Sequence, residues 1–289
     1  MRLTPAAAHA LCAGLVAADL VARAWRIRWF CRGLGHRIGF GEALTLNAFG
    51  DAACAVTPMR FGGEPARLAG MLRARVPAPA AFVAIGHEVL AAWPVTILCA
   101  GWLAWRYAPE WWATMGRGMI RTAAGAWPWV AAVALLSVAA WWLARRVAHP
   151  AVRHVRRPVA RIRVYWRRMP RWPVAASVVP SLVNLGSRVA ILPVLALTLP
   201  DPPALGPMLL GSFALLYSQL VLPTPSGAGA VDLGFLAGAA GDLGSGDHVL
   251  LLAWRFYTSG VGVLLGVALA ARLYGWRTVR RLFRRVEAR

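Results

Sequence analysis

The chain is 289 residues long, 59% of its residues are hydrophobic, and its mean hydropathy is +0.55. Uncharged apolar stretches long enough to cross about 30 Å of hydrocarbon recur along it, which predicts an all-α, polytopic membrane protein with about five to seven transmembrane helices. The net charge of +21 comes from 32 basic and 11 acidic residues. Because the arginines flank the apolar stretches, they favour anionic lipid over nucleic acid as the partner.

The first apolar stretch runs from about Pro5 to Phe30 and ends in a run of arginines. By the positive-inside rule, this end lies in the cytoplasm and the N-terminus lies outside. The stretch lacks a basic n-region, so we expect it to remain as a membrane span. We therefore expect a single multi-pass domain over residues 1–289 in the cytoplasmic (inner) membrane. A shorter apolar stretch, residues 40–57, follows, and Asn47 and Asp51 share one helix face within it.

Residues 57–67 (TPMRFGGEPAR) carry three charges, two prolines and two glycines in an otherwise apolar region. Pro58 and Pro65 remove backbone donors, and Gly62 and Gly63 permit turns, so we expect a break instead of a continuous helix. Basic residues on both sides predict a re-entrant hairpin that returns to the cytoplasmic side. Broken backbone persists at membrane depth only where protein or a water-filled cavity surrounds it.

We expect the later apolar stretches to cross the bilayer, and they cover residues 79–105, 126–144, 172–199, 204–222 and 248–271. A loop over residues 106–121 is expected on the outside. The densest basic stretch, residues 145–171, is expected on the cytoplasmic side. It is either a surface helix on anionic headgroups or a solvated loop. The basic tail over residues 272–289 is also expected in the cytoplasm.

A second broken element occupies residues 222–232 (LPTPSGAGAVD). Two prolines and two glycines interrupt the helix there: Pro223, Pro225, Gly227 and Gly229. A new half-helix can begin after them with free N–H groups that point at an anion, although a plain loop is the alternative. Asp232 is expected to favour the helix dipole or to pair with Arg255. Paired broken segments often mark the central site of a transporter.

A charge at the bilayer centre costs on the order of 3 kcal/mol, so intramembrane charges are candidate site residues. They are four arginines and three carboxylates: Arg60, Arg67, Arg188, Arg255, Glu64, Glu88 and Asp232. If all of them face one cavity, a net positive charge remains for an anion, and the planar arginine fork suits a phosphate. In a helical segment, Glu64 could bridge Arg60 and Arg67.

The alternative is that these charges only pair with one another and stabilise the fold. For Glu88 we favour a structural or gating role. Asn47 and Asp51 are candidates for polar lining of the cavity, with interhelical hydrogen bonding as the alternative.

The sequence contains no motif of the GxSxG, HExxH or CxxC kind. The four cysteines, Cys12, Cys31, Cys54 and Cys99, have no metal-like spacing. We therefore expect no catalytic residue, no metal and no cofactor. The alternative is a transferase that uses Glu64 or Asp232 as a base.

The two broken elements and Arg255 resemble the lysylphosphatidylglycerol synthase transmembrane-region family, a flippase-like membrane domain. The family element P-x-R-x-G-(G/D)-E-x-x-R is matched by residues 58–67. The element P-x-P-G-G-x-G-x-x-E is matched by residues 223–232, with Ser226 in place of a glycine and Asp232 in place of the glutamate. The resemblance covers roughly residues 8–272 and implies lipid handling.

The resulting hypothesis is a lipid translocase or lipid-binding transporter. It would move an anionic or phosphate-bearing amphiphile through a polar intramembrane cavity. One alternative is a membrane enzyme or accessory subunit of a lipid, hopanoid or polyprenyl-glycan pathway, and another is a small-anion transporter. The hypothesis requires that the two broken elements meet, with Arg60 and Arg255 on the same side.

Overall fold

The computed structural model describes residues 2–57, 59–113, 152–222, 224–239 and 247–274, and the regular elements of these residues are helices. The expected polytopic helical membrane fold is confirmed. Four helical stretches are long and apolar enough to cross a membrane: Pro5–Gly33, Ala78–Trp111, Arg171–Ala196 and His248–Leu269. The expected span over residues 126–144 lies outside the described residues, as do Pro58 and Pro223.

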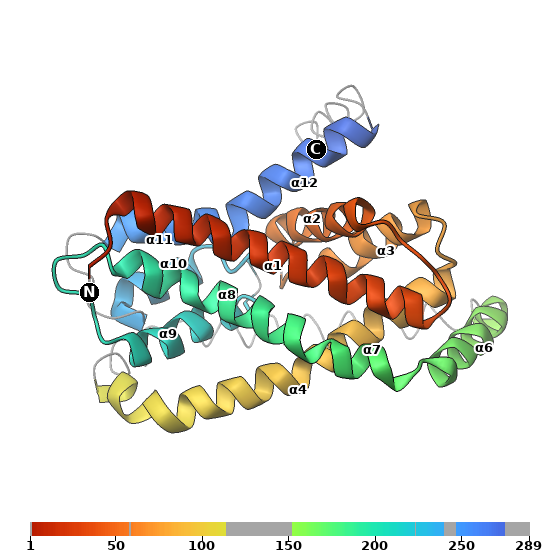
Figure 1. Cartoon of the computed structure of the whole chain (residues 1–289), viewed down its shortest axis with the longest axis horizontal. Coiled ribbons are helices and arrows are strands. Elements are labelled where there is room, and N and C mark those ends of the chain that lie inside the picture. Colours follow the sequence, from red (N-terminus) through yellow and green to blue (C-terminus); the bar gives the residue numbers. More distant parts are fainter. Residues whose placement is uncertain (1, 58, 114–151, 223, 240–246, 275–289) are drawn as a thin grey trace.

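The centre of the bundle is the pair formed by α1 (Pro5–Gly33) and α8 (Val178–Ala196), which pack along each other (Figure 1). The short α7 (Arg171–Ala176) precedes α8, and α4 (Ala78–Trp111) packs against α1 and α8. We expected a loop from residue 106 onward, but helix continues to Trp111.

Two hairpins of short helices complete the bundle, and the first is formed by α2 (Phe40–Val56) and α3 (Gly63–Arg73). The two helices are antiparallel. They also pack closely, as shown by Gly70, where an added Cβ atom would lie 2.9 Å from Cβ of Leu46. The hairpin begins and ends at the same end of the molecule, where α4 starts (Figure 1). Its turn contains Met59 and Arg60, both with positive φ. We define residues 57–62 as the first tip.

The break that the sequence predicts within residues 57–67 is present, because α2 ends at Val56 and α3 begins at Gly63, but Pro65 does not cause it. Pro65 lies in the first turn of α3, where the backbone N–H would have no intrahelical partner. Gly62 and Gly63 have ordinary backbone angles for a helix start. The hairpin requires glycine at these positions because there is no room for a side chain. A Cβ atom on Gly63 would overlap the Cys54 sulfur, and one on Gly62 would lie 2.7 Å from Cγ2 of Thr57.

The second hairpin replaces the span that we expected over residues 204–222. The helix α9 (Leu205–Ser218) has only 14 residues, a rise of about 21 Å, which is too short to cross the hydrocarbon. The chain then turns within residues 219–222 and 224–229 and returns along α9 as α10 (Ala230–Gly234) and the π-helical η2 (Phe235–Ala239). We define residues 219–222 and 224–229 as the second tip.

The two hairpins enter the bundle from opposite ends. The α2–α3 hairpin comes from the end where α1 finishes, and the α9–α10 hairpin comes from the end where the N-terminus lies (Figure 1). Each hairpin packs in its own apolar cluster. One cluster contains Phe30, Leu46 and Met71, and the other contains Leu192 and Trp254. The polar residues described below lie between these clusters.

The last helical stretch is interrupted in its middle. It consists of α11 (Asp247–Arg255), the π-helical turn η4 (Phe256–Gly260) and α12 (Val261–Tyr274), which packs on α2. A π-helical turn inside a helix often marks a functional position. Here it begins directly after Arg255.

The basic segment forms a helix, α6 (Val152–Arg168), so the alternative of a solvated loop is excluded for these residues. It packs against α4, where the rings of Trp166 and His87 lie 4.0 Å apart between centroids. Residues 145–151 and 275–289 of the expected basic regions lie outside the described residues.

Candidate functional site

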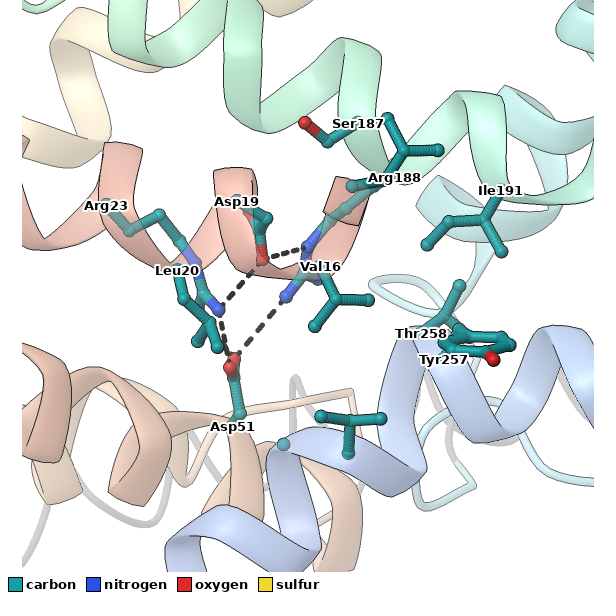
Figure 2. Close-up of a pocket in the computed structure, with 13 residues that line it drawn as sticks. Val16, Asp19, Leu20, Arg23, Asp51, Ser187, Arg188, Ile191, Tyr257 and Thr258 are labelled. Atoms are coloured by element: carbon teal, nitrogen blue, oxygen red, sulfur yellow. Dashed lines mark hydrogen bonds and ion pairs between the residues drawn. The ribbon is translucent and has the colours of Figure 1, made fainter. Parts of the chain in front are cut away.

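Four charged side chains form a closed ring at the centre of the bundle (Figure 2). Arg23 on α1 binds both oxygens of Asp51 on α2, at 2.9 and 2.7 Å, and contacts Asp19 one turn away on α1 at 2.9 Å. Arg188 on α8 closes the ring, with Nε 3.3 Å from Asp19 and Nη2 3.6 Å from Asp51. The ring ties α1, α2 and α8 together.

A second network lies around Glu88 on α4, which is 1% exposed. Its carboxylate accepts hydrogen bonds from Arg26 Nε at 2.8 Å and from Arg67 Nη2. Arg67 also pairs with Glu64 at 3.2 Å, and Arg26 reaches Ser181 at 3.1 Å. Glu88 therefore joins α1 to the α3 arm of the first hairpin, which is a structural contact, and the gating role stays a prediction.

The third network stabilises the second tip. Arg255 Nε donates to Asp232 at 2.7 Å, and Arg255 Nη1 donates to the Ser226 carbonyl at 2.8 Å. Asp232 also accepts from the Gly229 N–H at 2.9 Å. We expected the N–H groups here to face an anion, but this one is capped by the protein's own carboxylate. The pairing of Asp232 with Arg255 agrees with the sequence prediction.

The two tips meet through Arg60 and Gln219. Arg60 Nη1 donates to Gln219 Oε1 at 3.0 Å, although the residues are 159 positions apart. Gln219 is 1% exposed and packs on Gly227, where an added Cβ atom would lie 3.2 Å from Cγ of Gln219. The sequence predicts that residues 57–67 meet residues 222–232, and the contact that the structure shows is made by Gln219, three residues before that second element. Arg60 and Arg255 do not bond directly, since Gln219 and Gly227 lie between them.

A cavity of about 120 Å³ lies beside this contact. Its polar lining comes from both tips, α8, α9 and η4: Arg60, Asn184, Arg188, Tyr217, Gln219 and Thr258. Arg188 and Thr258 also line a smaller cavity of about 20 Å³ next to the ring (Figure 2), which is large enough for about one water molecule.

The charges in this part of the bundle do not cancel. In the ring, two arginines face two carboxylates; around Glu88, Arg26 and Arg67 face Glu88 and Glu64; and Arg255 faces Asp232. Arg60 has no carboxylate within ion-pair distance among the described residues, and its partner Gln219 is neutral. The centre of the bundle therefore carries one positive charge in excess, and Arg60 holds it beside the cavity.

A family model described as "Lysylphosphatidylglycerol synthase TM region" matches residues 2–266. The chain belongs to this family. No curated protein and no solved structure matches the chain. Membership makes the chain a multi-pass membrane protein of a lipid-related family. No group of three or more His, Cys, Asp or Glu side chains that could hold a metal occurs among the described residues.

The lysylphosphatidylglycerol synthase TM-region pattern in residues 58–67 is divided between two places in the structure. Arg60 faces the second tip, whereas Glu64 and Arg67 belong to the network around Glu88. Glu64 does not bridge Arg60 and Arg67, because Arg60 lies in a turn with φ of 60° and not in a helix.

The condition that all seven intramembrane charges face one cavity is not met, because of these seven only Arg60 and Arg188 line the cavity between the tips. Asn47 lies apart, 1% exposed, and its Nδ2 has no partner among the described residues. Of the predicted break residues, Gly227 and Gly229 have positive φ. Pro225 lies within the second tip.

Sequence reasoning missed Asp19, Arg23, Arg26 and Gln219. The two arginines were assigned to the basic end of the first span, although Asp19 and Arg23 are four residues apart, the spacing of a helical ion pair. Gln219 is neutral and lies in an apolar stretch, so nothing in the sequence marked it.

Proposed function

We propose that this chain is a lipid translocase that takes the phosphate-bearing headgroup of an anionic lipid into the cavity between the two tips. The acyl tails stay in the surrounding bilayer of the cytoplasmic membrane while the headgroup crosses. The observation that carries this proposal is the half-buried, unneutralised charge of Arg60 beside a cavity in a lipid-related membrane family.

The cavity offers a phosphate several hydrogen-bond donors. Arg60 and Arg188 supply guanidinium groups, which bind two phosphate oxygens at once. Gln219 adds its amide, because Nε2 is buried without a partner among the described residues. The single positive charge in excess suits a monoanionic phosphodiester, which would bring the centre of the bundle to neutrality.

The carboxylates support transport over catalysis. Asp19, Asp51, Glu64, Glu88 and Asp232 each bind at least one arginine. A carboxylate paired in this way orients its arginine partner, and its oxygens are already occupied by hydrogen bonds, which makes it poorly placed to act on a substrate. We infer that these groups hold the arginines in place and that the chain is not an enzyme.

The hairpins support a route through the membrane. If α2–α3 and α9–α10 are re-entrant from opposite faces, their tips meet near the bilayer midplane, and each hairpin covers one side of the cavity. Movement of one hairpin relative to the other would then open the cavity to one leaflet at a time. Discontinuous helices around a central site have this role in other transporter folds.

The proposal is tested by reconstitution into vesicles that contain fluorescent phosphatidylglycerol. Wild-type protein should speed the crossing of the headgroup, and Arg60→Gln should reduce the rate to that of empty vesicles. Arg161→Gln removes an exposed charge on α6 and is the matched control. This variant should move the headgroup across the membrane at the wild-type rate. Equal rates for Arg60→Gln and wild type would show that the site is wrong.

The enzyme alternative makes a different prediction for a strain that lacks the protein. Loss of a lipid species from the whole-cell lipid extract would favour enzymology. An unchanged set of lipids with a changed distribution between leaflets would favour translocation.

A further inference from the structure

A second concave site lies at the arginine-rich end of α1, away from the tips. It has a volume of about 260 Å³ and is lined by Trp25, Arg28, Trp29, Arg32, Arg37 and Ile38. We call it the terminal pocket. Three of its six lining residues are arginines and none is a carboxylate. No ion pair is formed by these three arginines within the part of the chain that the structure describes.

Arg28 is held in a fixed position in the terminal pocket. Its Nε donates to the Ile38 carbonyl at 3.1 Å, and its guanidinium carbon lies 4.6 Å from the ring centroid of Trp25 and 5.8 Å from that of Phe40. A guanidinium fixed in this way loses little conformational freedom when it binds a ligand. The two terminal nitrogens of Arg28 are not used by these contacts, so they remain as donors.

The position of the terminal pocket favours a lipid headgroup over a soluble anion as its ligand. It lies where α1 ends and the chain enters the loop to α2, at the same end as the basic helix α6 (Figure 1). Trp25 is 42% exposed, and tryptophan is the residue that favours the headgroup level of a bilayer. A pocket with arginines and tryptophans at this level meets lipid headgroups before any soluble ion.

We propose that the terminal pocket is a second lipid site, which binds the phosphate of an anionic phospholipid in the leaflet at the arginine-rich end. Arg28 binds the phosphate through its terminal nitrogens, and Arg32 and Arg37 neutralise the remaining charge. The ring of Trp29 contacts the glycerol and upper acyl carbons. This site is separate from the cavity between the tips and does not depend on the translocase proposal.

The test is native mass spectrometry of the detergent-purified chain titrated with phosphatidylglycerol, with phosphatidylcholine and with inorganic phosphate. Wild-type protein should bind phosphatidylglycerol at the terminal pocket in preference to phosphatidylcholine. Inorganic phosphate should not displace it. Arg28→Gln should weaken this binding about tenfold, the effect of losing one charge-assisted phosphate contact.

The double variant Arg32→Gln/Arg37→Gln keeps the backbone contact of Arg28 and should also weaken binding, so misfolding of one variant would not explain both results. The matched control is Arg161→Gln/Arg163→Gln, which removes the same charge from the exposed face of α6. Equal losses in the control and the pocket variants would overturn the proposal, because general electrostatics would then be sufficient. Displacement by inorganic phosphate would also overturn it, since the pocket would then be a site for a free anion.

The result is independent of translocation. Arg60→Gln should retain the lipid at the terminal pocket while losing headgroup crossing. Suppose that Arg60→Gln moves the headgroup at the wild-type rate while the pocket variants no longer bind phosphatidylglycerol. The translocase proposal then fails, and the second lipid site is still supported.

Discussion

Arg60 and Gln219 join the two hairpins of this protein by a single hydrogen bond, Nη1 to Oε1, at 3.0 Å. One residue comes from a turn between helices that enter from one end, and the other comes from a turn between helices that enter from the opposite end. The bond pairs a half-buried cation with a buried neutral amide. The charge of Arg60 is therefore positioned by the protein but not neutralised, which leaves it available to an anion.

Substitutions at Gln219 should separate the positioning of Arg60 from its charge. Gln219→Leu removes the acceptor of a half-buried charged donor and should lower the free energy of unfolding by about 1–3 kcal/mol. Gln219→Glu supplies a carboxylate to Arg60, so it should keep stability and yet reduce headgroup crossing about tenfold or more, because the excess charge is gone. Thermal unfolding in detergent and the vesicle assay measure the two effects. Full transport by Gln219→Glu would contradict the role given to the charge.

The ring of Asp19, Arg23, Asp51 and Arg188 should behave as one unit. Asp51→Asn leaves two half-buried arginines with one carboxylate and should cost about 3 kcal/mol of stability. Combining Asp51→Asn with Arg23→Met removes one charge of each sign and should recover part of this loss. A double-mutant cycle on thermal unfolding measures the coupling. Strict additivity would mean that the ring bonds contribute nothing as pairs.

Substitution of the two glutamates that bind Arg67 should lower the free energy of unfolding by very different amounts. Glu88 is buried and binds both Arg26 and Arg67, so Glu88→Gln should destabilise the protein by about 3 kcal/mol. The side chain of Glu64 is 51% exposed, so Glu64→Gln should cost about 0–1 kcal/mol. The comparison uses the same chemical change within one network. Equal losses of unfolding temperature would show that burial is not what matters there.

The close contact within the first hairpin should make Gly63 intolerant of any side chain. Gly63→Ala places a Cβ atom against the Cys54 sulfur and should cost about 1–3 kcal/mol through overpacking. Gly41→Ala in α2 has nothing within 4 Å of the new Cβ and should be neutral or stabilising by about 0.5–1 kcal/mol. Thermal unfolding of the two variants provides the measurement. Similar stabilities would indicate that the helices separate easily.

Much of this architecture follows from local sequence. Long apolar stretches identify the spans because a helix must satisfy its own backbone in lipid. Clusters of proline and glycine at residues 57–67 and 222–232 identify the two breaks. The family resemblance added the expectation that these breaks matter for lipid handling, and the family itself is confirmed.

The sequence does not predict which charged residues form ion pairs or hydrogen bonds with each other. Glu64 and Arg60 are four residues apart, yet the turn at Met59 and Arg60 directs them to different networks. Whether residues 204–222 span or reverse depends on tertiary packing of the second tip, and hydropathy does not report it. Gln219 is recognisable only once Arg60 is placed against it.

We propose that Arg60 and Arg188 together bind a lipid phosphate between the two tips. An experimental structure of the protein in lipid nanodiscs containing phosphatidylglycerol is the decisive measurement. We expect phosphate density within hydrogen-bonding distance of both guanidinium groups, with the acyl chains leaving the cavity between the helices. If the cavity holds only water and the lipid phosphates lie at the membrane surface, the proposed site is wrong.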